Sequence, residues 1–193
     1  MAVLLLGEVT DGALALDATA KAVSAAKALG DVTVLCAGAS AADAGAAAAK
    51  IDGVAKVLVA EDAALGHRLA EATAALIVSL AGDYSHIVAP ATTDAKNVMP
   101  RVAALLDAMV ISDVEMPDMD GYRLATEIRA DARLARLPIV LHTSLSGVFN
   151  QALVQKVGAD HFVPKFSPDE LAAAVKACLQ ANPELRVLRQ ESA

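Results

Sequence analysis

The sequence alternates short runs rich in Val, Ile and Leu with longer Ala-rich segments of helical period. A strand buried on both faces reads as an apolar run, and a helix between two such runs supplies the crossover that parallel pairing needs. The pattern therefore predicts an α/β fold with a doubly wound, Rossmann-like parallel sheet. The predicted strands cover residues 3–6, 32–37, 56–60, 86–91, 109–114, 138–143 and 161–164. The predicted helices cover residues 17–29, 41–50, 66–81, 97–107, 122–130, 148–157 and 168–180, and the fourth starts near Lys96 or Asn97 because Pro100 suits only a first turn.

Composition excludes several classes of partner. Only 3% of the residues are aromatic, Trp is absent and the formal charge is -7, so stacking platforms and basic patches for nucleic acid are not expected. The same charge disfavours an anionic membrane surface. The cysteines, Cys36 and Cys178, lie far apart without CxxC spacing, which is typical of buried free thiols in a reducing compartment. We therefore expect a cytoplasmic protein without nucleic-acid or membrane partners.

The composition changes near residue 112, although the alternation of strands and helices does not. Ala supplies 33 of residues 1–112 and 12 of residues 113–193. No Gly/Ser-rich or Pro-rich linker marks the change. We therefore expect one fused domain over residues 1–193, with residues 182–193 as a C-terminal tail.

The first part of the chain carries long runs such as MAVLLLGEVTDGALALDATAKAV and SHIVAPATTDAKNVMPRVAALLDAMVISDV. Residues 1 to about 112 resemble the N-terminal domain of the electron transfer flavoprotein alpha subunit. In that family the flavin sits mainly in a later domain of the subunit, and no segment of this chain resembles that domain. The resemblance therefore implies the fold of the N-terminal domain, and we expect no FAD.

The second part reads ISDVEMPDMDGYRLATEIRAD and then PIVLHTSLSGVFNQALVQKVGADHFVPKFSPDEL. Residues from about 111 to 181 resemble the C-terminal half of a CheY-like response-regulator receiver, with the chemotaxis coupling type as the nearest. The resemblance implies that Asp113 matches the phosphoacceptor, Thr143 the switch hydroxyl, Phe162 the switch aromatic and Lys165 the motif lysine. A carboxylate, a hydroxyl and an ammonium at the carboxyl ends of parallel strands also suit phosphate chemistry on physical grounds.

The chain departs from the receiver pattern where the metal would bind. A receiver holds Mg²⁺ with an acidic pair at the end of its own first strand, and that half of the receiver is replaced here. The strand before the change in composition ends in Ala91, Thr92, Thr93 and Asp94. We therefore expect Mg²⁺ binding to be weak at best, with Asp113 and Asp94 as weak candidate ligands, and no other metal site.

Both resemblances include the segment ISDV at residues 111–114, so a fusion there would let one strand serve both parts. The expected strand order is then 3-2-1-4-5-6-7, with every crossover right-handed. The two resemblances meet inside one domain, which favours a designed chimera. If the chain is a designed chimera, we expect that it retains no native activity and is not an enzyme.

Two alternatives remain open at this point. The chain could accept a phosphoryl group on Asp113, assisted by Thr143 and Lys165, with Asp94 standing in for the missing acids. It could instead be an electron transfer flavoprotein fragment that binds flavin. The parental partners, the flavoprotein beta subunit and chemotaxis signalling proteins, are expected to be lost, and self-association is left open.

Overall fold

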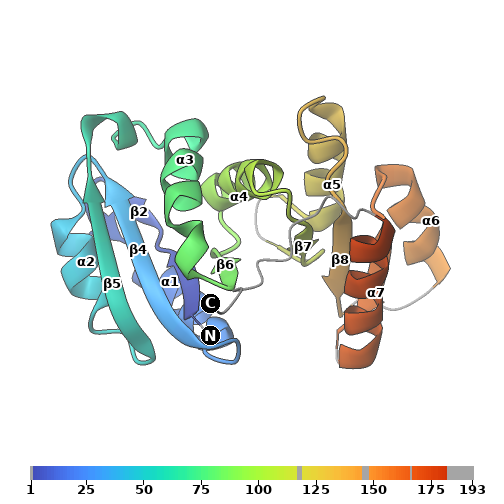
Figure 1. Cartoon of the computed structure of the whole chain (residues 1–193), viewed down its shortest axis with the longest axis horizontal. Coiled ribbons are helices and arrows are strands. Elements are labelled where there is room, and N and C mark those ends of the chain that lie inside the picture. The colour runs from blue at the N-terminus through green and yellow to red at the C-terminus, as the bar shows by residue number, and fades with distance from the viewer. Residues whose placement is uncertain (1, 117–118, 145–147, 166, 182–193) are drawn as a thin grey trace, which may run out of the picture. The chain divides into compact units, whose positions relative to one another are not determined.

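A computed structural model describes residues 2–116, 119–144, 148–165 and 167–181. The chain divides into two compact units, Met1–Met99 and Pro100–Ala193 (Figure 1). The predicted tail at 182–193 lies outside the described residues.

Unit 1 contains a parallel sheet of four strands in the order β5-β4-β1-β6. These strands are β1 (Ala2–Leu6), β4 (Asp31–Gly38), β5 (Val54–Glu61) and β6 (His86–Val88). The order equals the predicted 3-2-1-4, since β1, β4, β5 and β6 are the first four predicted strands. The last of them is shorter than predicted, because β6 ends at Val88 and not at Ala91.

The sheet of unit 1 is buried by apolar helices. Val3 and Leu5 of β1 pack with Val23 of α1 (Leu16–Ala26) and Ala44 of α2 (Ala42–Ala48). Leu4 and Leu6 alternate to the opposite face and are also buried. Unit 1 also contains η1 (Ala63–Leu65), α3 (Ala70–Leu80) and η2 (Ala81–Asp83). A run of apolar residues without alternation thus marks a strand covered on both faces, as the sequence predicted.

A short hairpin between β1 and α1 was not predicted. Strands β2 (Val9–Thr10) and β3 (Ala13–Leu14) pair antiparallel around Asp11 and Gly12. Both turn residues have positive φ, 50° and 81°, which is the conformation of a two-residue type I′ turn. The Asp-Gly dipeptide is a known sequence signal for this turn.

Helix α4 (Thr93–Leu105) corrects a second prediction. It begins before Lys96, so Pro100 lies inside the helix and not in its first turn. The Thr92 hydroxyl accepts a hydrogen bond from the Ala95 amide at 3.3 Å, and the Thr92 carbonyl accepts one from the Lys96 amide at 3.0 Å. A capping threonine therefore starts the helix earlier than the proline rule suggested.

Unit 2 contains a parallel sheet in the order β7-β8-β9. Its strands are β7 (Val110–Ser112), β8 (Ile139–Thr143) and β9 (His161–Pro164). Leu124 of α5 (Gly121–Ala130) and Val154 of α6 (Val148–Val157) pack with Ile139 and Leu141 of β8. Ala174 and Cys178 of α7 (Pro168–Ala181) pack with Val140 and Val163 in a separate cluster. Figure 1 shows these helices beside β8, and alternation along β8 places the two clusters on opposite faces of the sheet.

The order within unit 2 equals the predicted 5-6-7. The described strands therefore form parallel sheets of four and of three, in agreement with the predicted Rossmann-like α/β class. Pairing of the fourth with the fifth predicted strand, which would make one sheet of seven, stays a prediction. None of the helices within the described ranges is both long and apolar enough to span a bilayer.

Candidate phosphoacceptor-type site

Three polar side chains sit at the carboxyl edge of the unit 2 sheet. Asp113 follows β7, Thr143 ends β8 and Lys165 follows β9. The strands are parallel and in register, with Ser112 beside Leu141 and Thr143 beside Pro164. The topology therefore brings together the residues that the sequence singled out from three separate segments.

Asp113 and Lys165 form a direct ion pair. The Lys165 Nζ donates to Asp113 Oδ2 at 2.5 Å, and the two side chains are 33% and 28% exposed. The Lys165 backbone amide also donates to the Thr143 carbonyl at 2.7 Å, which fixes the point where the lysine leaves the sheet. This main-chain bond to the neighbouring strand positions Lys165 so that its ammonium reaches the Asp113 carboxylate.

The second carboxylate oxygen of Asp113 is also occupied. Asp113 Oδ1 accepts hydrogen bonds from the Val114 amide at 2.7 Å and from the Glu115 amide at 3.3 Å. The Glu115 carboxylate in turn accepts a hydrogen bond from the Ser144 hydroxyl. Donors of the chain therefore hold both oxygens of Asp113.

The turn after β7 depends on Gly121. Its amide donates to the Val114 carbonyl at 3.0 Å, and a Cβ at this position would collide with the Asp113 carbonyl oxygen. Asp120 caps the following helix, because its side chain accepts a hydrogen bond from the Arg123 amide at 2.7 Å. The glycine thus permits α5 to begin directly against the backbone of Asp113.

The other two residues of the receiver resemblance have different surroundings. Thr143 is fully buried. Phe162 is partly buried and packs against the same apolar cluster as Leu124 and Val154. Phe162 therefore contributes to the core of unit 2, and its role as a switch aromatic stays a prediction.

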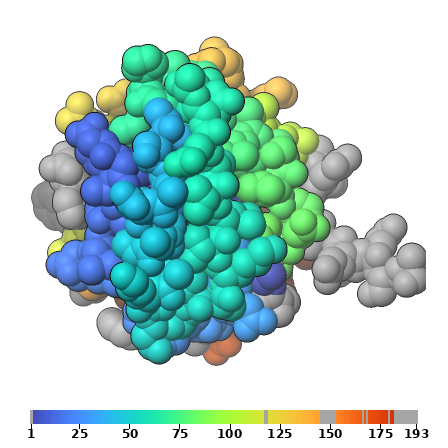
Figure 2. Space-filling view, turned by 90° about the vertical axis from the view of Figure 1, so that its left-hand side faces the viewer, coloured from blue at the N-terminus to red at the C-terminus, as the bar shows by residue number. Residues whose placement is uncertain are grey.

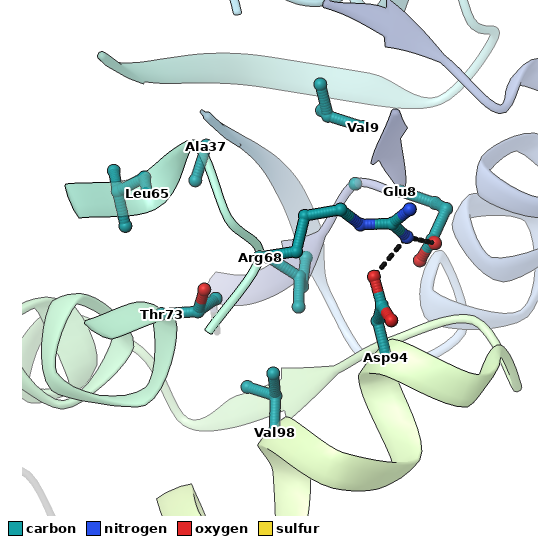
Figure 3. Close-up of a pocket in the computed structure, with 10 residues that line it drawn as sticks. Glu8, Val9, Ala37, Leu65, Arg68, Thr73, Asp94 and Val98 are labelled. Carbon is teal, nitrogen blue, oxygen red and sulfur yellow. Dashed lines mark hydrogen bonds and ion pairs between the residues drawn. The ribbon is translucent and has the colours of Figure 1, made fainter. Parts of the chain in front are cut away.

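A second polar cluster lies in unit 1 and was not predicted as a unit. Arg68 bridges Glu8 and Asp94, with 2.5 Å from its Nη2 to Glu8 Oε1 (Figure 3). The Thr92 hydroxyl donates to the other oxygen of Glu8 at 2.7 Å. Glu8 follows β1 and Thr92 follows β6, which are neighbours in the sheet. The predicted strand order places Glu8 and Thr92 at the ends of neighbouring strands. Arg68 comes from a loop, and nothing in the sequence pattern predicts its position beside Glu8.

This cluster determines the surroundings of Asp94. Asp94 is ion-paired with Arg68 in unit 1, whereas Asp113 is ion-paired with Lys165 in unit 2. Arg68 has a φ of 53°, in the left-handed region that non-glycine residues seldom adopt. Over the described ranges of the chain, no group of three His, Cys, Asp or Glu side chains is arranged to hold a metal ion.

The fold and the site together define a Rossmann-like parallel α/β protein with a carboxylate, a hydroxyl and a lysine at one sheet edge. The chain belongs to the electron transfer flavoprotein domain family, whose model matches residues 3–150. That match extends past residue 112, where the composition changes.

The relatives fall into two groups. The electron transfer flavoprotein subunit alpha of Paracoccus denitrificans is 84% identical over 114 residues, which cover 59% of this chain and 37% of the subunit. A response regulator of Synechocystis sp. is 41% identical over 75 residues, which cover 38% of this chain and 32% of the regulator. The chemotaxis protein CheV1 of Helicobacter pylori is 28% identical over 95 residues, which cover 49% of this chain and 26% of that protein.

The comparisons confirm the two resemblances drawn from the sequence. The chain joins a flavoprotein-alpha-like part to a receiver-like part. It spans little more than a third of the Paracoccus subunit and about a third of the Synechocystis regulator.

Proposed function

We propose that the chain is an engineered fusion in which receiver-derived strands complete a flavoprotein-alpha-type sheet, and that it retains neither parental activity. On this proposal the chain catalyses no reaction, and the fusion yields a folded α/β protein without a native activity. The abrupt change in Ala content at residue 112 and the two groups of relatives support an assembled origin.

The lack of a receiver-type set of metal ligands is the observation that carries the loss of phosphorelay activity. Over the described residues, no group of three His, Cys, Asp or Glu side chains is arranged to hold a metal ion. A phosphoryl group arrives with several negative charges, and Mg²⁺ bound by further carboxylates normally neutralises them. Glu8 and Asp94, the acids at the sheet edge of unit 1, are both ion-paired with Arg68. The donor set of the described residues therefore does not fit a receiver-type magnesium site.

Intact mass spectrometry tests this proposal. The full chain is incubated with Mg²⁺ and acetyl phosphate, beside the variant Asp113→Asn and an authentic receiver domain as a positive control. We expect an adduct on the authentic receiver and none on this chain. A phosphoryl adduct that Asp113→Asn abolishes would overturn the proposal.

Phosphoryl acceptance at Asp113 is the second candidate. The specific observation in its favour is that Lys165 Nζ lies 2.5 Å from Asp113 while Thr143 ends the strand between them. An ammonium at that position can stabilise negative charge on a transferred phosphoryl group. The same mass measurement decides between the two candidates.

The remaining parts of the proposal concern flavin, partners and location. We propose that residues 1–193, which cover 37% of the Paracoccus subunit, bind no flavin and purify colourless. A flavin absorbance spectrum in the purified protein would contradict this. We further propose that the parental partners no longer bind. Cys36 is a free, buried thiol, which supports a reducing, cytoplasmic location.

A further inference from the structure

Strand β5 ends the sheet of unit 1. In the sheet that the described residues form, β5 is hydrogen-bonded to β4 on one side, and its other side is the edge of the sheet. Figure 2 looks onto this side of the unit, where the teal atoms around β5 lie at the front surface. Val59, near the end of β5, is 47% exposed. A long apolar edge of this kind is a template for pairing with another strand.

The hydrogen bonds define which backbone groups face outward. The Asp62 amide donates to the Gly38 carbonyl of β4 at 3.1 Å. Because successive residues of a strand point their N–H and C=O groups to opposite sides, Lys56, Leu58 and Ala60 also bond toward β4. Val57, Val59 and Glu61 therefore direct their backbone groups away from the sheet. These groups can pair with a strand of a second molecule.

We propose that two copies of this chain form a homodimer by antiparallel pairing of β5, with Val59 facing Val59 across the two-fold axis. We name residues 56–62 the β5 edge. In this register Val57 faces Glu61 of the other copy, and all the facing pairs with outward backbone groups can exchange hydrogen bonds. A closed two-fold interface also removes the edge of both sheets.

Charge complementarity selects this register. With Val59 at the axis, Lys56 of one copy lies opposite Asp62 of the other, and the symmetry makes two such pairs. Lys56 and Asp62 are both exposed. Asp62 Oδ1 accepts a hydrogen bond from the Ala64 amide at 2.8 Å, so Oδ2 is the oxygen that meets Lys56 of the other copy. Between these pairs lie the apolar side chains of Val57, Leu58, Val59 and Ala60. Moving the axis by one residue, to Leu58, would set Lys56 opposite Ala60 and lose both ion pairs.

Sedimentation velocity over a range of protein concentrations tests the dimer. We expect a species of twice the chain mass that dissociates on dilution. Val59→Pro removes an outward N–H that β4 does not use, so the intramolecular ladder survives while the dimer is lost. Circular dichroism verifies that this variant is folded.

Charge variants test the register independently. Lys56→Asp sets two like-charged pairs in the interface and is expected to weaken dimerisation at least tenfold. Adding Asp62→Lys to it restores opposite charges and should recover most of the affinity. Lys50→Asp makes the same charge change at an exposed position outside the β5 edge and should leave the dimer intact.

The results of these experiments distinguish dimerisation through the β5 edge from association through another surface. A chain that is monomeric at every concentration overturns the proposal. So does a dimer that survives Val59→Pro, because another face would then hold the copies together. A failure of the double charge variant to recover dimerisation, with the fold intact, contradicts the Val59-centred register.

Discussion

The Lys165 ammonium lies 2.5 Å from the Asp113 carboxylate. The backbone of Lys165 is fixed by a hydrogen bond of 2.7 Å from its amide to the Thr143 carbonyl. The pair joins the ends of the two outer strands of the unit 2 sheet across β8. Both side chains are about a third exposed or less, so solvent screens the pair only in part. The pair can therefore stabilise unit 2 whether or not Asp113 has any reactivity.

Replacing Lys165 by Met tests that structural role. Lys165→Met removes the ammonium and leaves the aliphatic stem, so the free energy of unfolding should fall by about 1 kcal/mol. Urea denaturation measures the change. Lys176→Met, on an exposed position of α7, serves as the control and should change stability by less than about 0.5 kcal/mol. Equal stabilities for the two variants would show that the ion pair contributes nothing.

Gly121→Ala should destabilise unit 2. The added methyl group would collide with the Asp113 carbonyl oxygen, so the start of α5 must move. We expect a loss of about 1–3 kcal/mol in the free energy of unfolding, in the range of overpacked sites. The matched control is Gly82→Ala, because a Cβ at Gly82 has nothing within 4 Å. A neutral Gly121→Ala would contradict the close approach described for this turn.

Arg129 should not be replaceable by lysine. Its guanidinium donates to the Gly158 carbonyl at 2.7 Å, the Leu137 carbonyl at 2.8 Å and the Asp160 carboxylate at 2.9 Å. An ammonium cannot reproduce this fork, so Arg129→Lys should lower the unfolding free energy by about 1–3 kcal/mol. Arg123→Lys is the control, because Arg123 is exposed and its ion pair with Glu127 is 3.8 Å long. Similar thermal shifts in the two variants would refute this prediction.

The carboxylate of Glu61 makes stability depend on pH. It accepts hydrogen bonds from the Ala41 and Ala42 amides at 2.7 and 3.0 Å, and these bonds lower its pKa below the usual 4.5. The unfolded state then binds a proton more readily, so the stabilisation is present above pH 4.5 and is lost as the pH falls through the folded pKa. Glu61→Gln should be less stable than the wild type near neutrality, and this difference should shrink in acid. Urea titrations at several pH values measure it, and a difference that does not change with pH would contradict the assignment.

Much of the fold follows from patterns that the sequence displays. The apolar runs predicted the seven parallel strands found among the described residues. Helix α6 ends at Val157, directly before Gly158, whose φ of 73° suits a helix end. The two wrong predictions, the missing hairpin and the late start of α4, have local causes. The Asp11-Gly12 hairpin is too short to produce a periodic signal, and the Thr92 cap outweighs the preference of Pro100 for a first turn.

The candidate sites were predictable to different extents. Asp113, Thr143 and Lys165 meet because parallel strands bring their carboxyl ends to one edge, so a strand assignment was enough to group them. The occupation of Asp113 Oδ1 by two amides could not be predicted, since it depends on the turn after β7. Nor could the reach of Arg68 to Glu8, because loop conformation has no periodic pattern.

The proposed fusion requires the two family parts to unfold as one cooperative domain. The chain has two tyrosines, and they report on different units: Tyr84 lies in unit 1 and Tyr122 in unit 2. Fluorine NMR of the chain labelled with 3-fluorotyrosine follows both during urea unfolding. We predict that the two resonances change with the same midpoint, as a single two-state domain requires. Separate midpoints for Tyr84 and Tyr122 would contradict the claim and show two independently folding parts.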